Sequence, residues 1–364
     1  MALSKSKNIL FLSQFSLAIF SIAVVLLCAA LFAGAIYIAV FDMGQKQIGL
    51  LSPGETSSEP GFSRSLDLRV AAKNDYPSGP ITITQELGVA DGVSRMVFHF
   101  KVTADGLDEY GLMMLPSQKP SSGKYPTIIL CHGYESPSQY STTRDTLTDM
   151  SFYAQRGFAV LKPDFRGQGL SLNAGEADSA YYSMSYNTDL MSLLSAVKKT
   201  NNLDKTDISL WGFSMGAYIA LRATVLSPDV KNLILLSGPV DSMKQMYLTY
   251  IPPSDVNNLR ALKTRNDVFA KYGTPVENSS FWSAASPINF ANRIKAHVQL
   301  HAGQLDQIVP PEFSADLDKA LSQARVMHDY YTYPEGVHSL AAQRGLIWPR
   351  TLQILQTPAI TPAA

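Results

Sequence analysis

The fold of this chain is decided by residues 206–221, which read TDISLWGFSMGAYIAL. The part at residues 208–211 is short, apolar and begins with a β-branched side chain, which favours a buried parallel strand. From Met215 onward, Ala, Leu and Ile continue without a helix-breaking residue until Pro228, which favours a helix. The stretch therefore predicts a strand that passes directly into a helix.

Between the predicted strand and helix lies a Gly-x-Ser-x-Gly motif, from Gly212 to Gly216, with Ser214 at its centre. The chain must reverse so tightly here that side chains at the two glycine positions would collide with the strand or the helix. The reversal lifts the serine hydroxyl out of the sheet, at the positive end of the helix that follows. Because a strand precedes the motif and a helix follows it, we predict a nucleophile elbow; an ordinary strand-to-helix turn is the alternative.

The composition allows one large domain with additional segments, or two small domains, in 364 residues. The formal net charge is zero, so no nucleic-acid partner is expected. Cys28 lies in an apolar N-terminal run and Cys131 at the end of a predicted strand, so we expect no disulfide between them. Two of the six histidines, His297 and His301, are four residues apart, but they flank and end a predicted strand, so neither a metal site nor a cofactor is predicted. The oligomeric state is left open.

Residues 9–41 contain no charged side chain, whereas about 20 apolar residues suffice to cross a bilayer. Lys5 and Lys7 precede this run, so the positive-inside rule predicts a transmembrane signal anchor with residues 1–8 in the cytoplasm and the remaining chain extracytoplasmic. A signal peptide cleaved near Ala33-Gly34-Ala35, which would release a secreted protein, is the main alternative, and a buried core helix is a lesser one. Residues 42–65 are predicted to be a linker.

The domain predicted after the linker has a repeating order of strand, loop and helix. An N-terminal extension, residues 66–92, contains two candidate strands at 66–72 and 81–87. Residues 95–102 and 109–115 predict an antiparallel hairpin at a sheet edge. Further strands are expected at 127–131, 159–163, 208–211, 233–236, 298–302 and 328–333, with helices at 143–156, 189–199 and 311–323. This order predicts an α/β class, with a doubly wound, mostly parallel sheet over residues 93–364.

One interval in this domain is longer than a single crossover needs. It lies between the strands at 233–236 and 298–302 and is rich in aromatic residues and methionine. Its position, at the strand ends where a substrate would bind, favours an inserted cap over about residues 240–290. Additional core helices are the alternative.

The catalytic machinery is expected to consist of Ser214, an acid and a histidine, each from a separate loop. The order for this kind of sheet is serine, acid, histidine, each after a strand. His338 follows the last predicted strand within a Pro- and Gly-containing loop, so we expect it to be the base. Asp306 directly follows the strand at 298–302 and is the predicted acid; Asp241, one strand earlier, is the competing candidate.

The oxyanion intermediate requires two backbone N–H donors. Met215, directly after the nucleophile, is expected to supply one, and Tyr134, in the His132-Gly133-Tyr134 loop after the strand at 127–131, the other. His132 is expected to orient that loop. Asp164 and Arg166 are predicted to form a structural ion pair beside the site.

Several of these motifs together resemble the α/β-hydrolase domain of the prolyl oligopeptidase family. They are the His-Gly-Tyr loop, the Asp-x-Arg-Gly-x-Gly-x-Ser motif from Asp164, Gly-Phe-Ser-Met-Gly, and residues 286–289, which lead into the Asp306 loop. The resemblance extends from about Val93 to the C-terminus. It implies an α/β-hydrolase fold and a serine hydrolase with Ser214, Asp306 and His338 as its triad.

The resemblance leaves the substrate class open. The chain has no stretch for the N-terminal β-propeller of the large peptidases in that family, so esterase or thioesterase activity is as open as peptidase activity. We expect a small acyl substrate, either a short peptide or an ester. The alternative from another class is a non-catalytic binding protein with a hydrolase fold.

Overall fold

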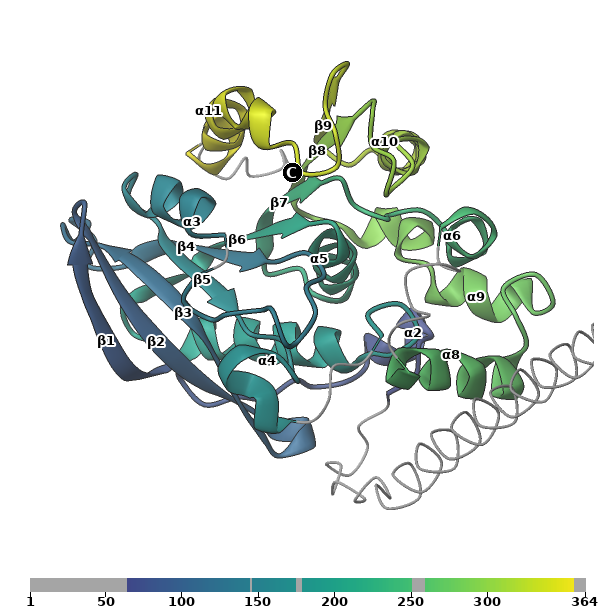
Figure 1. Ribbon diagram of the computed structural model, residues 1–364, viewed down its shortest axis with the longest axis horizontal. Coiled ribbons are helices and arrows are strands. Elements are labelled where there is room, and N and C mark those ends of the chain that lie inside the picture. The colour runs from purple at the N-terminus through teal and green to yellow at the C-terminus, as the bar shows by residue number, and fades with distance from the viewer. Residues whose placement is uncertain (1–63, 145, 175–178, 251–258, 357–364) are drawn as a thin grey trace, which may run out of the picture. The chain divides into compact units, whose positions relative to one another are not determined.

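A nine-stranded sheet forms the centre of the computed structural model in Figure 1, which describes residues 64–144, 146–174, 179–250 and 259–356. The strand order is β1-β2-β3-β5-β4-β6-β7-β8-β9. The pairs β1–β2, β2–β3 and β3–β5 are antiparallel, and the remaining neighbours are parallel. The strands are β1 (Thr82–Ala90), β2 (Val93–Val102), β3 (Leu107–Pro116), β4 (Tyr125–Cys131), β5 (Ala159–Pro163), β6 (Leu203–Phe213), β7 (Val230–Leu236), β8 (His297–Gly303) and β9 (His328–Tyr333).

Helices cover both faces of the sheet (Figure 1). The α-helices of the described chain are α2 (Leu68–Ala71), α3 (Leu147–Ala154), α4 (Ser185–Lys199), α5 (Met215–Leu226), α6 (Met243–Thr249), α8 (Leu259–Tyr272), α9 (Ser279–Ala285), α10 (Glu312–Gln323) and α11 (Arg344–Leu355). Short 3₁₀ turns are η1 (Thr103–Asp105), η2 (Gly169–Ala174), η3 (Pro287–Arg293) and η4 (Ala341–Gln343).

The two sheet faces are visible in the alternating side chains of β4. Ile129 and Cys131 pack into a core cluster with residues of α4, α5 and α10. Ile128 and Leu130 point to the other face and pack with residues of α3 and α11. A strand buried on both faces reads as a continuous apolar run, which is why the sequence indicated a doubly wound sheet. That prediction is confirmed, together with all six parallel strands and the three predicted helices, with shifted ends.

The N-terminal part of the sheet differs in two ways from the sequence-based expectation. The hairpin β2–β3 is confirmed, but β1 pairs with β2 on its outer side, so β1 and not the hairpin forms the edge. The strand predicted at residues 66–72 is wrong, because this stretch forms helix α2. Asp67 caps that helix by accepting a hydrogen bond from the Arg69 N–H, and the buried residues Leu68 and Ala71 follow a helical spacing.

The long interval between β7 and β8 holds α6, α8, α9 and η3. Met243 and Met246 of α6 and Trp282 of α9 are fully buried in a third cluster, with Tyr218 of α5 and Phe313 of α10. Helices α6 and α9 therefore pack as core helices, whereas α8 buries one residue of its fourteen. The function of this insertion as a cap stays a prediction.

The predicted membrane segment, residues 9–41, lies outside the described residues. Among the helices that the structure describes, none combines the length and apolarity needed to cross a bilayer.

Candidate active site

Ser214 lies at the sharp turn between β6 and α5. Its backbone has φ 52° and ψ −121°, a conformation that non-glycine residues rarely adopt. A β-carbon at Gly212 would lie 2.6 Å from the Ala217 Cα, and one at Gly216 would overlap the carbonyl oxygen of Cys131. The Ser214 N–H donates to the Leu236 carbonyl at 2.9 Å, which ties the turn to β7. The predicted elbow is thus present, and the two glycines allow it.

The side chains of Ser214, His338 and Asp306 form a continuous hydrogen-bonded series. His338 Nε2 lies 3.0 Å from Ser214 Oγ, and His338 Nδ1 lies 2.8 Å from Asp306 Oδ2. The other carboxylate oxygen, Oδ1, accepts from the N–H groups of Ile308 and Val309 at 2.8 and 2.9 Å. A carboxylate only accepts, so Nδ1 carries the proton and Nε2 can accept the serine proton. The structure thus brings together the three residues that the sequence indicated.

The acid loop and the histidine loop are tied together by their main chains. Gly303 ends β8 and lies against Gly336 so closely that a β-carbon at Gly303 would overlap the Gly336 carbonyl. The Leu305 N–H donates to this same carbonyl at 2.9 Å, and the Gln304 N–H donates to the Tyr333 carbonyl at 2.9 Å. The separation between Asp306 and His338 is therefore set by main-chain contacts between the loops that follow β8 and β9, two adjacent parallel strands.

The competing acid, Asp241, has a different environment. It is buried, and its Oδ1 accepts a hydrogen bond from the N–H of the next residue, Ser242. Burial raises the pKa of this carboxyl group above its usual value. Asp306, not Asp241, is the carboxylate that contacts His338.

The loop after β4 passes directly against the nucleophile. A β-carbon at Gly133 would lie 2.8 Å from the Phe213 ring and 3.4 Å from the Ser214 Cβ. His132 is buried and its Nδ1–H donates to the Gly133 carbonyl at 2.7 Å, while its ring packs 4.5 Å from that of Tyr140. This is the geometry expected of a residue that orients the loop.

The two predicted oxyanion donors belong to the helix and the loop that adjoin the serine turn. Met215 is the first residue of α5, directly after Ser214, and Tyr134 follows Gly133 in the loop after β4. Their N–H groups as oxyanion donors stay a prediction, taken up below.

The predicted ion pair between Asp164 and Arg166 is wrong. Arg166 instead binds Asp189 through Nε at 3.0 Å and Asp105 through Nη2 at 2.7 Å. Asp164 accepts hydrogen bonds from the Tyr140 hydroxyl at 2.7 Å and from a backbone N–H of η2. The carboxylates that bind Arg166 lie 23 and 61 residues away in sequence, so no local pattern could have identified them.

Glu109 of β3 was not singled out by the sequence. It is fully buried, with Oε1 3.9 Å from Arg166 Nε. Burial, and then the negative charge of Asp189, raise the pKa of Glu109 well above its ordinary value. Burial in the core therefore favours the neutral form of Glu109.

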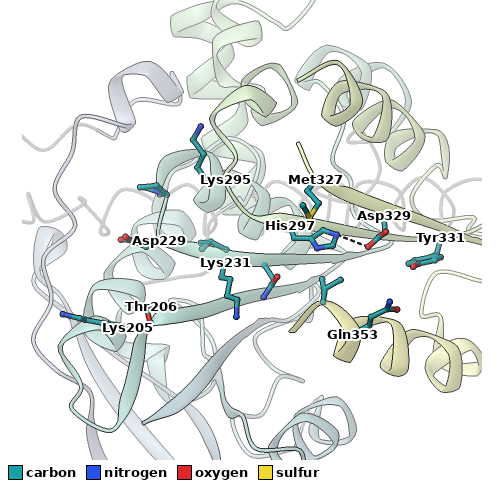
Figure 2. A pocket seen from close by; sticks show the side chains of 14 residues that line it. Lys205, Thr206, Asp229, Lys231, Lys295, His297, Met327, Asp329, Tyr331 and Gln353 are labelled. Carbon is teal, nitrogen blue, oxygen red and sulfur yellow. Dashed lines mark hydrogen bonds and ion pairs between the residues drawn. The ribbon is translucent and has the colours of Figure 1, made fainter. Parts of the chain in front are cut away.

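A cavity of about 590 Å³ lies at the amino ends of β6, β7 and β8 (Figure 2). Its lining includes Lys205 near the start of β6, Lys231 of β7 and His297 at the start of β8, whose Nε2 lies 3.0 Å from Asp329 Oδ2. These positions are amino ends of strands, whereas Ser214, Asp306 and His338 follow carboxyl ends. The cavity is therefore separate from the candidate active site. Over the described parts of the chain, no group of three or more His, Cys, Asp or Glu residues could hold a metal ion.

The sheet order, the turn at Ser214 and the three-residue series define an α/β-hydrolase fold with a candidate serine hydrolase site. The structure is similar to that of acetyl xylan esterase 1 from Thermoanaerobacterium sp., with a TM-score of 0.59 and 19% identity, over 83% of this chain and 97% of that one. It is also similar to Porphyromonas gingivalis dipeptidyl peptidase 4, with a TM-score of 0.54 and 19% identity, over 79% of this chain and 36% of that one.

The sequence profile of the prolyl oligopeptidase family matches residues 144–350, more than half of the chain. The chain belongs to the prolyl oligopeptidase family. Acylamino-acid-releasing enzyme from Sus scrofa is 22% identical over 245 residues, which are 65% of this chain and 31% of that relative. The chain thus spans about a third of the length of this curated relative.

Proposed function

We propose that this chain is a membrane-anchored serine hydrolase that cleaves an acyl bond through Ser214, His338 and Asp306. The observation that carries the proposal is the hydrogen-bonded series from Ser214 Oγ through the His338 imidazole to the Asp306 carboxylate. Its three members lie in loops after β6, β9 and β8, the arrangement of an α/β-hydrolase.

In the first half of the reaction, Ser214 Oγ attacks the carbonyl carbon while His338 Nε2 takes its proton. Asp306 accepts from Nδ1–H, which fixes the tautomer and stabilises the imidazolium that forms. The N–H groups of Met215 and Tyr134 hold the oxyanion of the tetrahedral intermediate. The intermediate collapses when His338 gives its proton to the leaving alcohol or amine, and the acyl group stays on Ser214.

In the second half, water attacks the acyl-enzyme and gives a proton to His338 Nε2. The second tetrahedral intermediate expels Ser214 Oγ, which takes the proton back from the imidazolium. The products are the free acid and the original enzyme, so the cycle uses no cofactor.

Ester hydrolysis has a specific point in its favour over peptide hydrolysis. The acetyl xylan esterase aligns with this chain over 97% of its own length, whereas the dipeptidyl peptidase aligns over 36% of its length. A domain of this extent makes up nearly the whole of that esterase, which supports ester hydrolysis as the first candidate. Peptidase activity on short peptides is the second candidate, supported by the match to the prolyl oligopeptidase family.

The anchor is the second part of the proposal. Residues 9–41 would span the membrane, with residues 1–8 cytoplasmic, residues 42–65 as a tether and the hydrolase domain extracytoplasmic. The full chain should stay with membranes after an alkaline carbonate wash, and deletion of residues 1–41 should release it. A mature N-terminus near residue 36 would instead establish a cleaved signal peptide.

Labelling by a fluorophosphonate probe tests the nucleophile. The purified full chain should incorporate one equivalent, and Ser214→Ala should abolish incorporation, because the probe reacts with an activated serine. Ser237→Ala is the matched control: Ser237 is also buried at the end of a strand and has a positive φ of 47°. A wild-type chain that takes up no probe would indicate a non-catalytic binding protein.

A substrate panel then separates the two hydrolase candidates. p-Nitrophenyl esters and aminoacyl-nitroanilides are compared at equal concentration, with Ser214→Ala as the blank. For an esterase, kcat/KM on the esters should exceed kcat/KM on the nitroanilides. This ratio should be at least about 10²-fold larger than the ratio of the spontaneous hydrolysis rates of the two substrate types. A preference for the nitroanilides would establish the peptidase.

A further inference from the structure

Three large apolar side chains beside the triad are exposed to solvent. Leu305 is 55% exposed, Ile308 59% and Val337 52%. Leu305 directly precedes Asp306, Ile308 follows it by two residues, and Val337 directly precedes His338. We refer to these three side chains as the apolar rim.

The two loops that carry the rim residues are joined by main-chain hydrogen bonds. The Leu305 N–H donates to the carbonyl of Gly336, the residue before Val337, at 2.9 Å. The Ile308 N–H donates to Asp306 Oδ1 at 2.8 Å, so Ile308 stays within one turn of Leu305. All these bonds use main-chain atoms of the rim residues. The triad is therefore held without the rim side chains, which point to solvent.

The rim carries almost no charge. From Gly303 to Pro310 the one charged residue is Asp306, whose side chain is 2% exposed and bound to His338. The nearest charged neighbour in the histidine loop is the exposed Glu335, two residues before Val337. Grouped apolar side chains on a surface are uncommon unless they contact a ligand or partner. An uncharged group of this kind fits an aliphatic ligand and offers no partner to a charged chain terminus.

The position of the rim relative to His338 indicates which part of the substrate it contacts. In the proposed reaction, His338 Nε2 gives its proton to the leaving group, so the leaving group lies beside the imidazole. Val337 is adjacent to His338 in the chain, and Leu305 is tied to the same loop. We propose that the apolar rim binds an aliphatic leaving group, so that the preferred substrates are esters of medium-chain apolar alcohols. This inference rests on the proposed function.

Isomeric esters test this assignment. Alkyl acetates from ethyl to hexyl lengthen the alcohol, and ethyl alkanoates from acetate to hexanoate lengthen the acyl group; hexyl acetate and ethyl hexanoate have the same composition. Acid release is followed below the solubility limit of each ester. We expect kcat/KM to rise about fourfold for each methylene that the rim covers, and therefore at least about tenfold from ethyl to hexyl acetate. Hexyl acetate should exceed ethyl hexanoate by a similar factor.

Rim variants test the residues. Leu305→Ser and Val337→Ser should flatten the alcohol series and reduce the ratio of kcat/KM on hexyl acetate to that on ethyl acetate to below about fourfold, the factor expected for one methylene contact. Leu346→Ser and Val89→Ser are the matched controls, because Leu346 on α11 and Val89 on β1 are similarly exposed but lie outside the triad loops. These controls should keep the full slope.

Four outcomes are distinguished. A slope in the alcohol series that the rim variants remove supports the proposal. A slope in the acyl series alone, or an alcohol slope that Leu305→Ser and Val337→Ser leave intact, overturns it. Equal rates along both series, with fluorophosphonate labelling of Ser214 retained, overturn it as well and leave the proposed function standing. Absence of both hydrolysis and labelling would instead reject the proposed function itself.

Discussion

His301 provides a sharp test of the electrostatics beneath the acid loop. It lies on β8, is fully buried, and has hydrogen-bond partners on both ring nitrogens: the Tyr333 hydroxyl donates to Nδ1 at 2.8 Å and Nε2–H donates to Gln299 at 2.9 Å. Arg350 donates to the same Tyr333 hydroxyl at 3.0 Å. Burial, and then the positive charges of Arg350 and Arg344, lower the pKa of His301 from 6.5 to about 3.

The lowered pKa makes the stability of the protein sensitive to acid. In the folded chain His301 stays neutral down to about pH 3, whereas in the unfolded chain it takes up a proton near pH 6.5. The stability that depends on this neutral imidazole is complete above pH 6.5 and declines as the pH falls. The decline approaches about 1.4 kcal/mol per pH unit and amounts to about 2 kcal/mol between pH 6.5 and pH 4.5.

The measurement is urea-induced unfolding of the purified full chain, followed by tryptophan fluorescence at pH 7.5, 6.5, 5.5 and 4.5. His301→Gln should be the less stable protein at pH 7.5, because the glutamine cannot satisfy both partners. Since glutamine does not titrate, the difference in unfolding free energy should narrow below pH 6.5 by up to about 1.4 kcal/mol per unit. A difference that stays constant from pH 7.5 to 4.5 would refute this reasoning, because every other titrating group is common to both proteins.

Three further substitutions have clear expected outcomes. Asp306→Asn should lower kcat/KM on p-nitrophenyl acetate by about 10⁴, since an amide favours the wrong imidazole tautomer, whereas Asp241→Asn should change it less than about threefold. Gly216→Ala should lower the unfolding free energy by about 3 kcal/mol or more in a urea titration, because its β-carbon would overlap main-chain oxygens, while Gly345→Ala, which meets open space, should not destabilise the protein. Glu109→Gln should become more stable relative to wild type as the pH rises from 4 to 7. Because the pKa of Glu109 is raised in the folded protein, ionisation of this residue favours the unfolded wild-type chain over that range. Equal pH dependence of the two unfolding free energies in urea titrations would contradict this.

Local patterns predicted most of the sheet and the candidate triad. The strands buried on both faces read as short apolar runs, and β6 passes into α5 through two glycines that admit no side chain. His338 and Asp306 could be selected because each follows a strand in a loop with turn residues. These features depend on neighbours in the chain, so one sequence suffices to read them.

Features that depend on residues far apart in the sequence could not be predicted. The place of β1 at the sheet edge depends on which strand covers β2, and β1 is too exposed to have a clear alternating pattern. The partners of Arg166 come from η1 and α4, and nothing near Arg166 indicates them. The helix at residues 68–71 is four residues long, which is too short for periodicity to separate it from a strand.

The main-chain bond from Leu305 to the Gly336 carbonyl has a consequence for how this hydrolase could diversify. Because glycine contacts and peptide groups hold the acid and the base in register, the side chains that project from the same two loops can be exchanged without disturbing the proton transfer. Selection, or a designer, could thus alter the preferred alcohol by changing residues 305 and 337 while the chemistry stays intact. Substitution of Gly303 or Gly336 would remove that freedom.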